Sequence, residues 1–237
     1  MNDVDRVICS DPHDLAATVA AELADRLALP GVHHLVVTGG GVGTSILSEL
    51  RVAPRAIDWA TVHVWWSDER FLPAGDPERN ETSAREALLD HVPIPPHHVH
   101  PMPSDIGQSA EDAALMYAAE LARESQDGVA PGFDVLLLGM GPEGHVASIF
   151  PHSAAVRRPD LVTAVYDCPK PPPTRVSFTL PLINTATQVW IMAAGAAKAA
   201  AATAASSNEV SPEDVPAAGA RGRESTVLWL DRQSASG

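Results

Sequence analysis

Apolar runs of about five residues alternate with helix-like segments along most of the chain. Strands are predicted at residues 4–9, 34–38, 61–66, 133–138, 161–166, 175–180, 188–193 and 226–230. The segment 133–138 contains a continuous apolar run, which is typical of a strand whose two faces are both covered in a parallel sheet. The alternation of strands and helices predicts an α/β fold with a mainly parallel sheet.

The segments between these strands have helical patterns. One helix begins after residues 10–12, where a capping residue precedes a proline in the first turn. A glycine loop at residues 39–45 opens a second helix, which has Ile46, Leu47 and Leu50 on one face. Further helices are predicted at about residues 80–91, 109–124 and 193–205, the last from its alanine content. We expect residues 1–237 to form a single domain.

Composition and charge narrow the class of protein. The net charge of −14 argues against binding to nucleic acid or to an anionic membrane surface. No apolar run approaches the roughly 18 to 20 residues of a membrane-spanning helix. The first residues carry acids and no apolar core, so we expect no signal peptide and a cytoplasmic location. Cys9 and Cys168 form no C-x-x-C pattern and are expected to be reduced thiols.

The most informative segment is the strand and glycine turn at residues 133–145. Its glycines form a G-x-G-x-x-G pattern at 139–144. In dinucleotide-binding proteins an acidic residue that binds the ribose follows this pattern by about 20 residues, and Asp167 lies near that position. However, Glu143 places a carboxylate where a pyrophosphate would lie, and Pro151 cuts short the helix that should bind it. A dinucleotide-binding turn is therefore not the favoured interpretation.

The same turn places an imidazole beside a carboxylate. His145 follows the glycines at the end of a strand, two residues after Glu143. A lone histidine is often a core residue that hydrogen-bonds to the backbone, and that interpretation stays open. A nearby carboxylate can also orient the ring or raise its basicity, as a general base near neutral pH requires. We favour a catalytic role for His145, with Glu143 as its partner.

Two other strand ends carry candidate ligands for an anion, because ligands of open α/β sheets bind outside the carboxyl ends of the strands. The loop at 39–45 can hold a phosphate on its free N–H groups, or can simply be a tight turn. Residues 68–70 are either a solvated charged run or, if they face that loop, place Arg70 to form a bidentate contact with phosphate. Lys198 is either a phosphate ligand or a solubilising residue of its alanine-rich helix.

Two further kinds of site are not favoured. His97, His98 and His100 lie in a proline-rich stretch with no matching carboxylate or thiol spacing. We expect exposed loop histidines there and no metal site. The chain also has no G-x-S-x-G pattern, which argues against the serine nucleophile of an α/β-hydrolase.

Several blocks of sequence stand out when taken in order and spacing: T-G-G-G at 38–41, W-S-D-E-R-F-L-P at 66–73, E-R-N at 78–80, G-M-G-P-E-G-H-V-A-S-I-F-P at 139–151, R-V-S-F-T-L-P at 175–181 and G-A-A-K at 195–198. Together they closely resemble the 6-phosphogluconolactonase family, and the likeness runs from about residue 5 to residue 232. The resemblance implies a Rossmann-like fold of the glucosamine-6-phosphate deaminase and ribose-5-phosphate isomerase type. It also implies hydrolysis of 6-phospho-D-glucono-1,5-lactone in the oxidative pentose phosphate pathway, without a cofactor or a metal.

The resemblance assigns roles to individual positions. It implies that His145 is the general base. The implied substrate and phosphate ligands are Gly40, Gly41, Gly43, Thr44, Asp68, Arg70, Asn80, Arg175 and Lys198. The expected partner is a small sugar-phosphate lactone, and the expected state is a monomer or a weak homo-oligomer.

Some positions depart from the family pattern. The usual G-G-S-T-P loop is replaced by G-G-G-V-G at 39–43, which removes hydroxyl groups and leaves phosphate binding to backbone N–H groups, Thr44 or Ser45. The usual aspartate two residues before the histidine is Glu143, and the threonine after it is Val146.

Two rival functions follow from the same resemblance. Glucosamine-6-phosphate deaminases carry a G-H-I-A-F-N-E-P motif and a D-E-Y motif. Here Phe150 takes the place of the glutamate and Arg70 that of the tyrosine. A non-catalytic sugar-phosphate-binding module of a DNA-binding regulator is the second rival, and we expect no spare segment for a DNA-binding helix-turn-helix.

Overall fold

A seven-stranded sheet forms the centre of the computed structural model, which describes residues 3–53 and 56–237. Its strand order is β1-β10-β9-β6-β2-β3-β5, and every neighbouring pair is parallel. The strands are β1 (Val4–Cys9), β2 (His33–Val37), β3 (Val62–Trp66), β5 (Val99–His100), β6 (Val135–Gly139), β9 (Gln188–Ala193) and β10 (Ser225–Asp231). This sheet confirms the fold class predicted from the alternating pattern.

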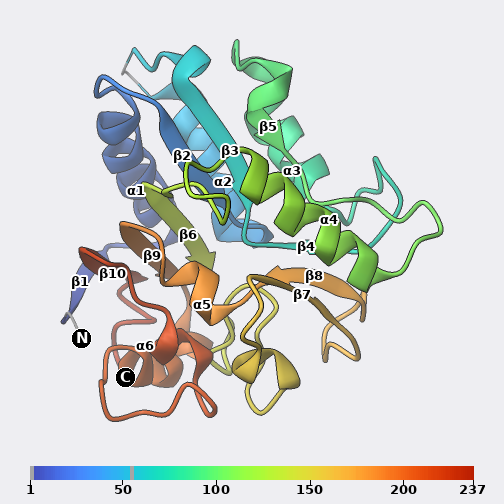
Figure 1. Cartoon of the computed structure of the whole chain (residues 1–237). Helices are drawn as coiled ribbons and strands as arrows, with labels where there is room; N and C mark the ends of the chain where they lie inside the picture. The colour runs from blue at the N-terminus through green and yellow to red at the C-terminus, as the bar shows by residue number, and fades with distance from the viewer. Residues whose placement is uncertain (1–2, 54–55) are drawn as a thin grey trace.

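A second, antiparallel sheet lies beside the first (Figure 1). Its order is β4-β8-β7, with β4 (Asp68–Arg70), β7 (Val162–Val165) and β8 (Arg175–Phe178). The sequence pattern placed the segments 161–166 and 175–180 in the α/β alternation, because an apolar run does not reveal which strand it pairs with. In the structure they pair with each other and with the short strand that follows β3.

Helices cover the large sheet, with α4 in front of it and α2 behind it (Figure 1). The α-helices are α1 (Pro12–Leu27), α2 (Gly40–Val52), α3 (Asn80–Ala87), α4 (Ala110–Arg123), α5 (Leu180–Ile183) and α6 (Ala199–Ala205). The side chain of Asp11 caps α1 by accepting hydrogen bonds from two N–H groups, and Ser109 with Asp112 forms a capping box at α4. None of the described helices is long and apolar enough to cross a bilayer.

Two helices are shorter than the sequence pattern predicted. The helix predicted over 80–91 ends at Ala87, and a 3₁₀ turn, η2 (Leu89–His91), follows it. The helix predicted over 193–205 starts only at Ala199, after a 3₁₀ turn, η5 (Ala196–Lys198). Gly195 has a φ of +94°, which is outside the helical range, so no helix can extend through this residue from β9 to the turn. Lys198 therefore lies at the start of the helical segment and not in its middle.

The glycine loop predicted at 39–45 is largely helical. α2 already begins at Gly40, with Gly39 as its N-cap and no side chain that caps it. A side chain at Gly39 would collide with Asn80, because a Cβ there would lie 1.9 Å from Asn80 Oδ1. The absence of a side chain at this position lets α3 approach the amino end of α2.

The strand order places a ligand-binding edge at the centre of the sheet. From β2 the chain continues to β3 and β5 on one side, whereas from β6 it continues to β9 and β10 on the other. The neighbouring strands β2 and β6 therefore flank a topological switch point. In open α/β sheets, ligands bind in the crevice outside the carboxyl ends of such strands.

Candidate functional site

A pocket of about 380 Å³ opens at the carboxyl ends of β2 and β6. Nine of the predicted site residues line it: Gly40, Gly41, Gly43, Asp68, Arg70, Asn80, His145, Arg175 and Lys198. Glu143 contacts His145 beside the pocket. Thr44 does not line it; this residue borders a separate depression with Pro12 and His13. The fold thus brings together residues that are up to 158 positions apart in sequence, from Gly40 to Lys198.

The imidazole of His145 is held between an aromatic ring and a carboxylate. Its ring centroid lies 4.4 Å from that of Phe150, and its Nδ1 lies 3.0 Å from Glu143 Oε1. The two groups are close neighbours but are not aligned as a hydrogen bond, since Nδ1 has no hydrogen-bond partner within the described residues. With Nδ1 on the carboxylate side, Nε2 is the nitrogen left to exchange a proton with a substrate or water.

The glycines after β6 shape the turn that carries this imidazole. Gly141 N–H donates to the carbonyl of His145 over 3.0 Å, and a Cβ at Gly141 would lie 2.1 Å from His145 Nδ1. Gly144 has a φ of +83°, a conformation that strains residues with a side chain. The G-x-G-x-x-G pattern therefore lets the backbone pack directly against the histidine. No α-helix follows β6 in the described chain before α5, so the pattern forms no helix amino terminus for a pyrophosphate.

Lys170 completes a charged triplet with Glu143 and His145. Its Nζ lies 3.2 Å from Glu143 Oε1. Burial alone would raise the pKa of Glu143, but its own backbone N–H, His145 and Lys170 together lower it. Burial lowers the pKa of His145 below its ordinary value, although Glu143 opposes that effect. At neutral pH the site thus presents an uncharged imidazole next to an ionised carboxylate, as general-base chemistry requires.

The small sheet brings Asp68, Arg70 and Arg175 to one wall of the pocket. Arg70 and Arg175 pair directly across β4 and β8. Arg70 Nη1 donates to the carbonyl of Glu78, while its buried Nε has no partner within the described residues. Arg175 donates to the carbonyls of residues 170–172 and so holds the segment that carries Lys170. Asp68 Oδ2 accepts a hydrogen bond from the hydroxyl of Ser148 over 2.7 Å.

Another wall of the pocket combines a helix amino terminus with a cation. Gly40 and Gly41 form the exposed first turn of α2, whose free N–H groups favour anions. Lys198 lines the same pocket, and its ammonium group makes no hydrogen bond or ion pair within the part of the chain that the structure describes. Burial, followed by the charge of Lys170, lowers the pKa of Lys198. An anion in the pocket would supply the partner that this ammonium lacks.

Sequence reasoning missed two features of the site. Lys170 lies in a proline-rich segment without motif spacing, although it is one of only two lysines in the chain and both line the pocket.

The second feature is the buried pair of Glu69 and Arg79 beneath α3. Glu69 accepts hydrogen bonds from the N–H groups of Arg70, Asn80 and Glu81, and so fixes the chain that carries Arg70 and Asn80. Burial raises the pKa of Glu69 to about 7, against the effect of these donors and of Arg79.

The histidines at 97–100 were predicted to be exposed loop residues, and this is wrong for His100. His97 is exposed and His98 is half-buried, but His100 is buried at the end of β5. Its ring stacks on Trp65, with centroids 3.8 Å apart. The proline-rich composition did not reveal that this stretch contains an edge strand of the main sheet. Cys9 and Cys168 are both free, as predicted.

Fold and pocket together define a class: α/β proteins whose switch-point pocket combines an uncharged imidazole with several cationic side chains. The family model for "Glucosamine-6-phosphate isomerases/6-phosphogluconolactonase" matches residues 11–229, and the chain belongs to this family.

Named relatives narrow the comparison within the family. A 6-phosphogluconolactonase of Mycobacterium tuberculosis is 45% identical over 99% of this chain and 95% of the relative. One of Streptomyces coelicolor is 45% identical over 100% of this chain and 95% of the relative. The crystal structure of 6-phosphogluconolactonase from Thermotoga maritima, 26% identical, covers 97% of this chain and 100% of that one with a TM-score of 0.83. A monomeric glucosamine-6-phosphate deaminase has a TM-score of 0.82 over 98% of this chain and 99% of that one but is 19% identical, a likeness of fold alone.

Proposed function

We propose that this protein hydrolyses 6-phospho-D-glucono-1,5-lactone to 6-phospho-D-gluconate, the second step of the oxidative pentose phosphate pathway. The observation that carries the proposal is the 45% identity, along nearly the whole chain, to relatives named 6-phosphogluconolactonase. The pocket supports it, because an uncharged imidazole and several cations face one cavity.

His145 acts as the general base in the proposed reaction. Its Nε2 takes a proton from a water molecule as the water oxygen adds to the lactone carbonyl carbon, C1. The tetrahedral oxyanion then collapses and breaks the bond between C1 and the ring oxygen. The imidazolium returns its proton to that leaving oxygen, and the new carboxylic acid ionises to release one proton. Glu143 supports the cationic ring during this cycle.

The phosphate is bound at the wall formed by the first turn of α2 and Lys198, with Arg70 at its edge. The N–H groups of Gly40 and Gly41 supply donors in place of the hydroxyl groups that the G-G-G-V-G loop lacks. Four cationic side chains, Arg70, Lys170, Arg175 and Lys198, focus positive charge in a chain of net charge −14. Distant acids are screened beyond about 8 to 10 Å at physiological salt.

A direct assay distinguishes this function from the deaminase alternative. Freshly generated 6-phospho-D-glucono-1,5-lactone is expected to be hydrolysed faster than the uncatalysed background, measured as acid release in a pH-stat. Glucosamine 6-phosphate is expected to release no ammonia above the blank. Ammonia release without lactone hydrolysis would reverse the assignment. Sugar-phosphate binding without either activity would favour the non-catalytic module.

The pH dependence of kcat should report the lowered pKa of His145. Because the base acts when uncharged, kcat rises with pH through this pKa and then levels off. Its midpoint is expected below pH 6.5. Glu143→Gln removes a charge that raises the pKa of His145, so the midpoint should move to still lower pH. The midpoint is taken from kcat because a phosphate monoester itself titrates near pH 6. A midpoint above 6.5, or one that moves upward in Glu143→Gln, would contradict the proposed pair.

We further propose a cytoplasmic location, which the two free, buried cysteines support, since thiols persist in reducing compartments. The expected monomer or weak homo-oligomer stays a prediction, and analytical ultracentrifugation would test it.

A further inference from the structure

A second group of polar side chains lies away from the lactone pocket, between the sheet and α4. His63 is near the start of β3, whereas the pocket lies beyond the carboxyl end of this strand. In the parallel pairing of β3 with β5, His100 stands opposite Trp65. Since side chains alternate between the faces of a strand, His63 and His100 point to the same face. Glu120 in α4 and Glu124 at its end contact these two histidines.

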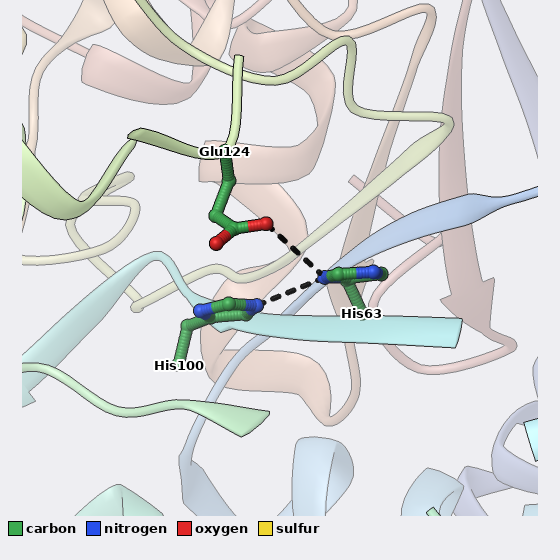
Figure 2. Close-up of side chains that lie close together, drawn as sticks. All are labelled: His63, His100 and Glu124. Carbon is green, nitrogen blue, oxygen red and sulfur yellow. Dashed lines mark hydrogen bonds and ion pairs between the residues drawn. The ribbon is translucent and has the colours of Figure 1, made fainter. Parts of the chain in front are cut away.

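Three atoms of this group converge on one point (Figure 2). His63 Nδ1 lies 3.0 Å from His100 Nε2 and 4.0 Å from Glu124 Oε2, and all three atoms lie within 4.8 Å of one another. Two imidazole nitrogens on a tetrahedral zinc ion are about 3.3 Å apart, given Zn–N bonds of about 2.0–2.1 Å. Small side-chain rotations would therefore convert this arrangement into a coordination sphere.

The surroundings favour the ligating form of His100, whereas His63 Nδ1 donates its hydrogen to His100 Nε2 in the metal-free cluster and would bind a metal once that hydrogen moves to its own Nε2. His100 Nδ1 lies 3.1 Å from Glu120 Oε1, so Nδ1 carries the proton and the lone pair of Nε2 faces His63. A carboxylate behind a histidine is the arrangement that orients metal-binding imidazoles. Glu124 is 36% exposed, which gives an ion access from solvent.

We propose that His63, His100 and Glu124 form a binding site for a divalent zinc-type metal ion, separate from the lactone pocket. Two imidazoles and one carboxylate suit zinc, whereas magnesium and calcium prefer sets of oxygen ligands. Three protein ligands leave a fourth position for water. The ion would join the edge strand β5 and the end of α4 to β3, and would stabilise the native state by mass action. The sequence predicted no metal, because the carboxylate comes from a helix more than twenty residues after the histidine-rich stretch.

Zinc titration of the metal-free protein tests this site. Chelator-treated protein, competed against a chromophoric chelator, should bind one equivalent of Zn²⁺, and the melting temperature should rise with Zn²⁺ but not with Mg²⁺. Glu124→Gln and His63→Asn should each weaken Zn²⁺ binding at least 10-fold and remove most of the thermal shift. Glu120→Gln, which removes the support behind His100, is expected to weaken it about 10- to 100-fold.

His97→Asn is the matched control, because it removes an exposed imidazole from the same stretch without touching the three ligands. It should bind Zn²⁺ as the wild type does. Glu124 is partly exposed and its substitution by glutamine keeps its shape, so this variant carries the test if His63→Asn does not fold. A wild type that binds no Zn²⁺ at micromolar concentration would overturn the proposal, as would Glu124→Gln binding as tightly as wild type. Either result would leave a hydrogen-bonded cluster without a metal.

Discussion

Replacing His145 by alanine is expected to lower kcat for 6-phospho-D-glucono-1,5-lactone by about 10²- to 10⁴-fold, the range that positioned general bases contribute. The imidazole is the uncharged base of the pocket, and burial together with Phe150 holds it in place. Binding of 6-phospho-D-gluconate, measured by isothermal titration calorimetry, should stay within about 3-fold of wild type. The phosphate ligands lie on other elements and are not changed by this substitution.

His152→Ala is the control for this substitution. It removes another histidine from the segment after the glycine turn, but His152 is 68% exposed and contacts Glu213 and Asp214 instead of the pocket. Its kcat should equal that of wild type. If His145→Ala keeps wild-type turnover while its product affinity is unchanged, another group activates the water and the assignment of the base is wrong.

Lys198→Ala should raise the KM for the phosphorylated lactone by about 10- to 100-fold with little change in kcat. Hydrogen bonds to charged groups contribute about 1.5–3 kcal/mol, and this ammonium has no partner within the described residues that could compensate. Because the phosphate is remote from the reacting carbonyl, the loss of this contact affects ground state and transition state alike.

Arg70→Ala is also expected to raise the KM for the phosphorylated lactone strongly. An unchanged KM would remove Arg70 from the phosphate site.

An unphosphorylated substrate separates phosphate binding from general damage to the site. With D-glucono-1,5-lactone, Lys198→Ala and wild type should have the same kcat/KM. The exposed Arg232, which lies outside the pocket, offers a control for net charge, and Arg232→Ala should leave both substrates unaffected. Equal losses with the two lactones would show that Lys198 does not act through the phosphate.

Much of the fold is contained in local patterns. The apolar runs at 133–138 and 188–193 correspond to β6 and β9, and the capping signal before α1 marks where this helix begins. These features depend on residues near one another in sequence, so periodicity and capping chemistry reveal them. The start of α6 was misplaced, because alanine propensity does not account for the turn at Gly195. The end of α3 was placed too late, since the helix gives way to a 3₁₀ turn after Ala87.

Pairing between distant segments was not accessible in the same way. The runs that became β7 and β8 have ordinary strand composition, yet they form a separate sheet with β4. That sheet sets Arg70 opposite Arg175 on one wall of the pocket. The motif order placed both arginines near the cleft, but no local signal showed that Arg175 holds the segment that carries Lys170.

The sequence by itself determined the α/β class, the glycine turn that bends tightly enough to carry His145, and the resemblance that points to a lactone as substrate. The turn depends on residue identities over a short span, whereas the fold class and the resemblance depend on the order and spacing of such segments along the chain. The tertiary structure decided which side chains lie together: Lys170 contacts Glu143, Lys198 lines the same pocket as the first turn of α2, and Glu124 lies near His63 and His100. Such contacts depend on the packing of elements remote in sequence, and burial there decides whether an imidazole stays uncharged.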